Sequence, residues 1–200
     1  MPNLFQNPTY NGKFLSPNSA KPIAGVCTNT AYKRPLTQVK VSDTMIAIGS
    51  PVEITNKFSQ STAVNAGMDL APNVMNASAS KSNLDGFLVM SPNAILEDGD
   101  EFPKYLKNQV VHCALIGSGA ELYLPADNSL VGKNVSKISL YWHKTDMTLK
   151  EGVGDSGSTG WGLGEVLILS QVVEGIMSYI DTGDNNKVKT KNIPVIKIKI

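Results

Sequence analysis

The residues of this sequence that could do chemistry are few, and the most distinctive is a serine in a glycine-rich segment. Gly154-Asp-Ser-Gly157 sets Ser156 close to two glycines, and His112 lies upstream in an apolar run. A serine nucleophile needs a histidine within hydrogen-bonding distance to take its proton. It also needs a carboxylate, here Asp127 or Asp146, to orient that histidine. These four side chains are the candidates for a hydrolytic triad.

The spacing of these residues argues against that chemistry. Gly154-Asp-Ser-Gly157 resembles the segment around the nucleophile of chymotrypsin-like serine proteases, and His112-Cys113 resembles the pair that carries their general base. However, only about 40 residues separate His112 from Ser156, too few for the two barrels of that fold. The glycine run 152–164 also lacks the Lys and Ser/Thr that complete a phosphate-binding loop. We therefore expect no catalytic residue, and a mobile loop or a close backbone contact at this run.

Three further patterns are candidates for ligand sites. The acidic stretches 97–101 and 181–184 offer oxygen ligands, but without the spacing of a calcium loop, so we expect solvated turns there. Cys27 and Cys113 are too few for a disulfide framework or a thiolate zinc site, and we expect reduced, buried thiols with no metal or cofactor. Aromatic side chains at strand positions could form a sugar-stacking platform: Trp142, Trp161, Tyr123, Tyr141 and Tyr179.

The composition excludes whole classes of partner. Of 200 residues, 42% are hydrophobic and 18% are charged, while Asn, Ser and Thr together supply 47. The net charge is +1 and there is a single arginine, so the chain lacks the basic surface of a nucleic-acid-binding protein. No apolar run approaches the length of a membrane-spanning helix, and the first residues lack the features of a secretory signal.

Residues 1–22 are predicted to form an extended arm. Four prolines and four asparagines disfavour a helix there. Five large apolar residues are dispersed through the arm, which a purely disordered tail would lack. We expect the arm to lie on a surface, either of its own domain or of a neighbouring subunit. Its candidate contact residues are Leu4, Phe5, Tyr10, Phe14 and Leu15.

The remaining residues, 23–200, are predicted to form one all-β domain with long loops, either a small β-barrel or a β-sandwich. At least eight short apolar runs alternate with turn residues, and none shows a helical stripe. Runs 109–116 and 120–125 flank Gly117-Ser-Gly119 and are expected to pair as a hairpin. Ile196, Ile198 and Ile200 alternate with lysines, which predicts a half-buried strand near a sheet edge. Residues 59–83 are expected to be a long loop.

Part of this domain resembles the decoration, or cement, proteins that coat the capsids of tailed bacteriophages. The resemblance covers residues 84–140. It rests on Leu84-Asp-Gly-Phe-Leu-Val89, Pro103-Lys-Tyr-Leu-Lys107, the strand 110–116, Gly117-Ser-Gly-Ala-Glu-Leu-Tyr-Leu124 and Leu130-Val-Gly-Lys-Asn-Val135. It implies a small β-domain without cofactors that binds the major capsid protein, as a homotrimer or another homo-oligomer.

The expected function is therefore that of a virion structural protein on the capsid surface, made in the host cytoplasm and not an enzyme. Such a protein bridges capsid subunits against the pressure of packaged DNA by burying apolar surface and adding strands at exposed edges. The alternative is a carbohydrate- or receptor-binding β-domain of a phage fibre or spike, with aromatic side chains on one exposed patch. A hydrolase that uses Ser156 and His112 is the third hypothesis.

Overall fold

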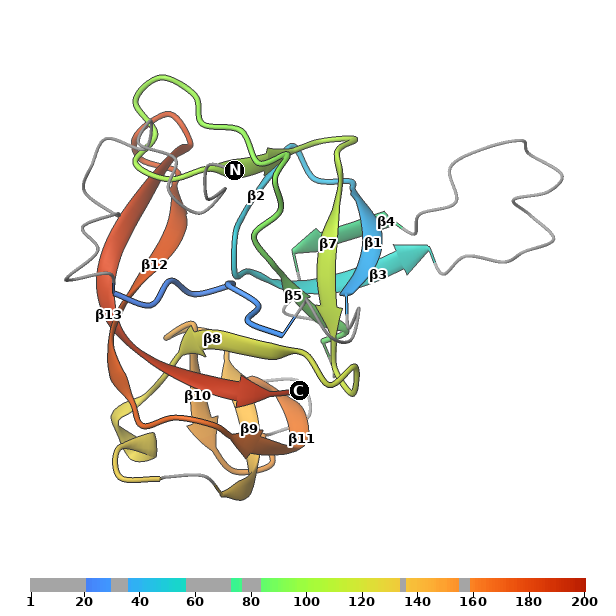
Figure 1. The fold of residues 1–200 in the computed structure, drawn as a ribbon. Helices are drawn as coiled ribbons and strands as arrows, with labels where there is room; N and C mark the ends of the chain where they lie inside the picture. The colour runs from blue at the N-terminus through green and yellow to red at the C-terminus, as the bar shows by residue number, and fades with distance from the viewer. Residues whose placement is uncertain (1–20, 30–35, 57–72, 77–83, 134–135, 155–158) are drawn as a thin grey trace, which may run out of the picture.

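The computed structural model describes residues 21–29, 36–56, 73–76, 84–133, 136–154 and 159–200 (Figure 1). These residues form an all-β structure, as predicted, with one short 3-10 helix. The elements are β1 (Leu36–Val41), β2 (Met45–Ala47), β3 (Pro51–Asn56), β4 (Asn73–Asn76), β5 (Gly86–Leu88), β6 (Lys104–Leu106), β7 (Val110–Leu115), β8 (Glu121–Pro125), η1 (Asn128–Leu130), β9 (Lys137–His143), β10 (Thr148–Glu151), β11 (Gly160–Ile168), β12 (Val173–Asp181) and β13 (Lys187–Lys199).

The first sheet has a closed pairing order and forms a small barrel. Its strands follow one another as β1–β4–β3–β5–β7, and β7 pairs back with β1. All of these pairs are antiparallel except β1 with β4. A separate two-stranded sheet consists of β2 and β6. Its residues Ile46 and Tyr105 pack into the apolar cluster inside the barrel.

The second sheet is built around the long strand β13. Its order is β10–β9–β11–β13–β12, with β8 also paired to β13. The first part of β13, from Lys187 to Val195, pairs with β12 to form a long hairpin. The remainder pairs with β8, and Ile198 and Lys199 also pair with β11. Figure 1 shows β13 running from the hairpin beside the barrel down to the sheet that contains β8 and β11.

Two apolar clusters share the strands of the barrel. Phe87 and Leu88 are neighbours in β5, and because side chains alternate along a strand they enter different clusters. Leu88 packs within the barrel, whereas Phe87 packs with Trp142 of the second sheet, their ring centroids 5.3 Å apart. The two sheets are therefore joined by a common core.

The predicted hairpin of β7 and β8 is wrong. Gly117 and Gly119 do turn the chain, with φ of 84° and 77°. However, β7 pairs with β1 and β5 in the barrel, while β8 pairs with β13 in the second sheet. The turn therefore carries the chain from one sheet to the other, because each strand finds its backbone partners far away in the sequence.

The alternation predicted for the last strand is confirmed, and the strand lies next to a sheet edge rather than at one, since β12 is the last strand in the sheet order. Ile196 and Ile198 are fully buried. Strand β13 is paired on both sides, with β8 on one side of residues 198 and 199 and β11 on the other. Lys197 does not discourage pairing at an edge, because it forms an ion pair with the neighbouring strand: its Nζ lies 2.9 Å from Glu121 Oε2 on β8.

The glycine run is partly a strand. Gly160, Gly162 and Gly164 lie in β11, so the predicted loop over 152–164 is shorter than expected. A Cβ atom on Gly160 would lie 2.5 Å from Cδ2 of Tyr141 and 2.6 Å from the Trp142 carbonyl oxygen. The glycines therefore allow a close packing contact with β9, one of the two alternatives. Strand β4 lies within the loop predicted over 59–83, and the other residues of that loop lie outside the described residues.

Gly86 should be intolerant of a side chain. A Cβ atom there would lie 2.3 Å from the Ala114 carbonyl oxygen, on the neighbouring strand of the barrel. Because backbone atoms on a paired strand cannot move aside cheaply, we expect Gly86→Ala to lower the free energy of unfolding by about 1–3 kcal/mol. Gly183→Ala is the control, since a Cβ atom there meets only a side-chain oxygen at 3.3 Å. Urea unfolding would measure both, and equal stabilities would contradict the prediction.

Candidate functional site

The first described residues of the chain are hydrogen-bonded to the second sheet. Ile23 forms a parallel bridge with Ile176 of β12. The backbone N–H of Ala24 donates to the Ile176 carbonyl at 2.8 Å, and the N–H of Ile176 donates to the Pro22 carbonyl at 2.9 Å. Within the described residues, this is the only pairing on the edge of β12 that faces away from β13.

The same segment continues as a partner of β8. The N–H of Gly25 donates to the Tyr123 carbonyl at 2.9 Å, and the N–H of Tyr123 donates to the Val26 carbonyl at 3.2 Å. Farther along, Cys27 forms an antiparallel bridge with Leu122. Residues 21–29, which we call the anchor segment, therefore join β12 at one end and β8 at the other.

Side chains hold the far end of the anchor segment. The amide of Asn29 donates to the Gly119 carbonyl at 2.9 Å and accepts from the Glu121 N–H at 3.0 Å. Cys27 lies beside it, with Sγ 3.4 Å from the Asn29 side-chain oxygen, and burial raises the pKa of this thiol. Gly25 permits the bend between the two ends, because its φ is +85° and a Cβ atom would lie 2.6 Å from the Gly49 nitrogen. The anchor segment is thus a built part of the fold.

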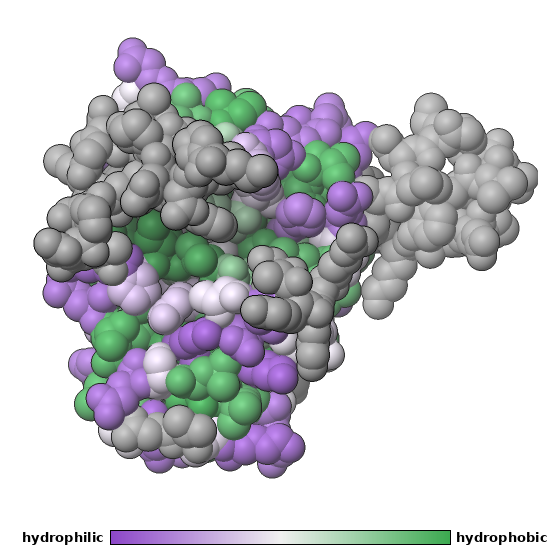
Figure 2. Space-filling view, in the orientation of Figure 1, coloured by the Kyte–Doolittle hydropathy of each residue, from purple (hydrophilic) through white to green (hydrophobic). Residues whose placement is uncertain are grey.

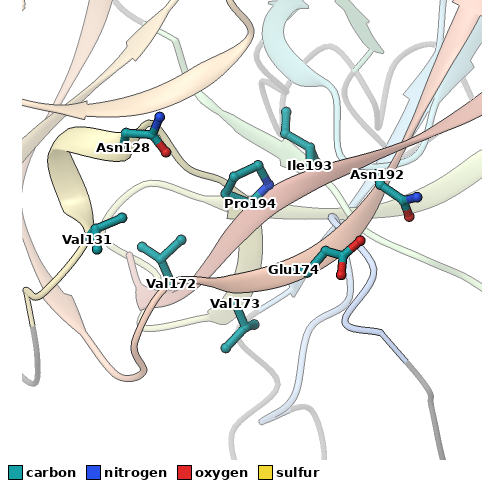
Figure 3. A pocket seen from close by; sticks show the side chains of 8 residues that line it. All are labelled: Asn128, Val131, Val172, Val173, Glu174, Asn192, Ile193 and Pro194. Atoms are coloured by element: carbon teal, nitrogen blue, oxygen red, sulfur yellow. The ribbon is translucent and has the colours of Figure 1, made fainter.

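An open groove of about 300 Å³ lies beside this anchor segment (Figure 3). Residues from η1, the start of β12 and the middle of β13 line it. Val131 is 62% exposed and Val173 is 41% exposed, values that are high for apolar side chains. The lining residues are Asn128, Val131, Val172, Val173, Glu174, Asn192, Ile193 and Pro194.

Lys21 connects the anchor segment to the groove. Its Nζ lies 2.5 Å from Glu174 Oε1 and 3.2 Å from Asn192 Oδ1, and both of these residues line the groove. The described chain therefore begins at the rim of the groove. Such an arrangement can bind an extended peptide, because this edge of β12, apart from its bridge with Ile23, is not paired with any other described strand, and the valines supply apolar contact area.

The predicted contact residues of the arm lie outside the described residues: Leu4, Phe5, Tyr10, Phe14 and Leu15. Sequence reasoning missed the anchor segment and the groove. Nothing local in the sequence marks Val172 and Val173 as groove residues. The groove beside these two valines is formed by the positions of η1 and β13. A local sequence pattern does not encode those positions.

The predicted triad is not assembled among the described residues. Ser156 lies outside them. His112 meets a different serine, with its Nδ1 3.1 Å from the Ser91 hydroxyl, and that hydroxyl also accepts the backbone N–H of His112 at 3.1 Å. Asp127 caps η1 by accepting the N–H of Ser129, and this hydrogen bond holds the pKa of the carboxyl below its ordinary value. His112 and Asp127 each have a local structural partner.

Asp146, the other candidate carboxylate, lies in the turn between β9 and β10. Its Oδ2 is 3.0 Å from His143 Nδ1 and 2.5 Å from Lys150 Nζ. The hydrogen bond from Lys150 is the main reason that the pKa of Asp146 lies below its ordinary value. Asp146 thus lies beside His143, whose Nδ1 accepts the backbone N–H of Asp146 at 3.2 Å, whereas His112, the histidine of the triad hypothesis, has Ser91 as its partner.

The acidic turn 97–101 is not a solvated turn throughout. Lys104, 1% exposed, places its Nζ 3.0 Å from Asp100 Oδ2 and 2.7 Å from Glu97 Oε2. Asp100 Oδ1 accepts the backbone N–H of Val188 at 2.8 Å. The turn is therefore fastened to β6 and to the β12–β13 hairpin. Among the described residues, no group of three or more His, Cys, Asp or Glu side chains is placed to hold a metal ion.

The two tryptophans belong to the core. Trp142 is 1% exposed and Trp161 is 4% exposed, so neither offers a face on which a sugar ring could stack. Figure 2 shows that the apolar surface of the visible face lies in patches separated by hydrophilic surface. The carbohydrate- or receptor-binding alternative would therefore need aromatic residues other than these two.

Comparisons with known proteins do not identify this chain. No family model, no curated protein and no solved structure matches it. In the described part of the chain, no helix has the length and apolar character that crossing a bilayer would require.

Proposed function

We propose that this protein is a capsid decoration protein of a tailed bacteriophage, which binds the major capsid protein and bridges capsid subunits. The observation that carries the proposal is the anchor segment. Residues 21–29 are hydrogen-bonded to both β12 and β8. The apolar residues of the arm, which precede this segment, are therefore tethered to one defined place on a β-domain.

In the proposed function, the protein attaches to the capsid through the extended peptide of its arm rather than through a flat face of its β-domain. Residues 1–20 contain a single charged side chain, Lys13, together with five large apolar residues. Burying this segment against a neighbour would therefore require little removal of water from charges. Contacts of this kind can be individually weak and still give stable attachment to the capsid, because they are repeated over a symmetric shell or within a homotrimer or other homo-oligomer. The resemblance of residues 84–140 to decoration proteins supports the same function.

Deleting residues 2–20 should separate binding from folding. We expect the full chain to cosediment in many copies with assembled heads of the phage whose genome encodes it. The truncated chain should bind at least about tenfold more weakly, the loss expected from removing one or two contacts of more than 1 kcal/mol. Its melting temperature should stay nearly unchanged, because Lys21 and the anchor segment remain.

A full-length variant provides the matched control for chain length. It replaces Leu4, Phe5, Tyr10, Phe14 and Leu15 by serine, and it should bind as weakly as the truncated chain. The proposal is wrong if the full chain does not bind the heads, or if the truncated chain binds them equally well.

A further inference from the structure

The described chain contains two Asp-Gly pairs, Asp85-Gly86 and Asp98-Gly99, in very different surroundings. An Asp-Gly pair can react with itself when the backbone nitrogen of the glycine attacks the side-chain Cγ of the aspartate. The new N–Cγ bond closes a succinimide ring, and the hydroxyl of the protonated carboxyl group leaves with the amide hydrogen as water. Water then opens the ring at either carbonyl, which restores aspartate or gives isoaspartate. Glycine favours this closure because it has no side chain in the way and turns freely.

Asp98-Gly99 has the freedom that ring closure requires. Both residues are exposed and lie at a turn in the loop that precedes β6. Gly99 has a φ of 83°, a conformation that its missing side chain permits. Among the described residues, no hydrogen bond or ion pair holds the Asp98 carboxylate. The side chain of Asp98 can therefore turn toward the nitrogen of Gly99.

A cation lies beside the peptide that would react. Lys187 Nζ donates a hydrogen bond to the Asp98 carbonyl oxygen, and Figure 1 shows the loop that precedes β6 beside the end of the β12–β13 hairpin. The Gly99 nitrogen must lose its proton to attack, and the resulting negative charge spreads onto this carbonyl oxygen. A cation placed at that oxygen stabilises the charge.

Asp85-Gly86 is held by the pairing of the barrel strands. Asp85 Oδ2 accepts the backbone N–H of Ile54 at 2.7 Å. Gly86 is buried in β5 and pairs with Val52 on one side and with Leu115 on the other. Ring closure at this pair would first require local opening of the barrel, so it should be much slower than at Asp98.

An isoaspartate at residue 98 would alter the turn that fastens Lys104. The N–H of Asp100 donates to the Glu97 carbonyl at 3.1 Å, and Asp100 Oδ2 accepts the N–H of Glu97 at 3.2 Å. Isoaspartate adds a carbon atom to the backbone between these two residues, so neither hydrogen bond can keep its geometry. The ion pair between Asp100 and Lys104, 3.0 Å long, depends on the same turn.

We infer that Asp98 is a site of spontaneous isomerisation through a succinimide, and that the isoaspartate product loosens the turn that holds Lys104. Asp85 is spared because its glycine is paired on both sides. The inference rests on the exposure and pairing of the two Asp-Gly pairs, and it does not depend on binding to capsids.

Prolonged incubation of the full chain at pH 7 in heavy-oxygen water tests the site. Each succinimide that opens takes one oxygen atom from the water, and mass spectrometry with electron-transfer fragmentation locates the labelled residue. One tryptic peptide, residues 82–104, contains both Asp85 and Asp98. Label and isoaspartate should accumulate at Asp98 at least about tenfold faster than at Asp85.

The same chain unfolded in urea is the control, because there the two pairs should react at similar rates. The site assignment is wrong if the folded chain labels Asp85 as fast as Asp98. It is also wrong if Asp98 stays unlabelled in the folded chain after the urea sample has reacted.

Two matched variants give an independent comparison of the sites. Asp98→Asn and Asp85→Asn place an amide at each pair, and a neutral amide is attacked more readily than an ionised carboxylate. Asp98→Asn should deamidate at least about tenfold faster than Asp85→Asn, and equal rates would refute the inference. The isoaspartate fraction of the aged natural chain, separated by chromatography, should unfold at a lower urea concentration than fresh protein. An unchanged midpoint would overturn the effect assigned to the turn.

Discussion

Lys104→Met should lower the free energy of unfolding by about 3–5 kcal/mol, the cost of removing one partner from a buried ion pair. Lys104 is 1% exposed and the Asp100 side chain is fully buried, with Nζ and Oδ2 3.0 Å apart. Without the lysine, the Asp100 carboxylate would remain buried with only backbone N–H donors, those of Val188 and Glu97. Urea unfolding at pH 7 would measure the loss.

Two variants control for side-chain size and for charge. Lys189→Met, on β13, removes a surface ion pair with Asp184 and should change stability much less. The double variant Asp100→Asn with Lys104→Met should recover much of the loss, because it leaves no unpaired buried charge at residue 100. If Lys104→Met and Lys189→Met are equally stable, the buried pair does not have the role assigned to it.

The pH dependence of this effect has a definite sign. Burial raises the pKa of Asp100, but hydrogen bonds from Val188, Lys104 and Glu97 outweigh it, so the pKa lies below its ordinary value. A carboxyl group of this kind contributes stability above its unfolded pKa, and that contribution is lost as the pH falls through the folded pKa. The difference between the unmodified protein and Lys104→Met should therefore be full at pH 7 and shrink below about pH 4.

Trp142→Ala should lower the free energy of unfolding by about 3–5 kcal/mol, the usual cost of truncating a fully buried aromatic residue. Trp142 lies on β9, yet its ring packs against Phe87 of the barrel. The substitution therefore opens a cavity between the two sheets. We expect one cooperative transition at a lower midpoint in urea, observed both by circular dichroism and by the fluorescence of Trp161.

Two further substitutions, one conservative and one on the surface, serve as references for the loss of stability in Trp142→Ala. Trp142→Phe keeps a ring against Phe87 and should cost less than Trp142→Ala. Val153→Ala, at a valine 80% exposed, should have almost no effect. Two separate transitions in Trp142→Ala, one for each sheet, would contradict a common core.

Two features of the structure, the buried Lys104 and the anchor segment, had no local indication in the sequence. Lysine is almost never fully buried unless it is paired, so nothing in Pro103-Lys-Tyr-Leu106 predicts that Lys104 lies inside. Its burial depends on Asp100 and Glu97, which were predicted as a solvated turn. Likewise, Pro22 to Val26 was divided between an arm and a domain, although the structure joins these residues to β12 and β8.

The sequence by itself determined the all-β class and which side chains of a strand face inward. Ile196 and Ile198 alternate with lysines, and their burial follows because neighbouring side chains on a strand point to opposite faces. The tertiary structure alone decided which strands pair. Backbone N–H and C=O groups are the same at nearly every residue, so β7 could pair with β8 as well as with β1 in a local reading. Long-range packing chose β1 for β7 and β13 for β8, and so left the groove beside Val173 open.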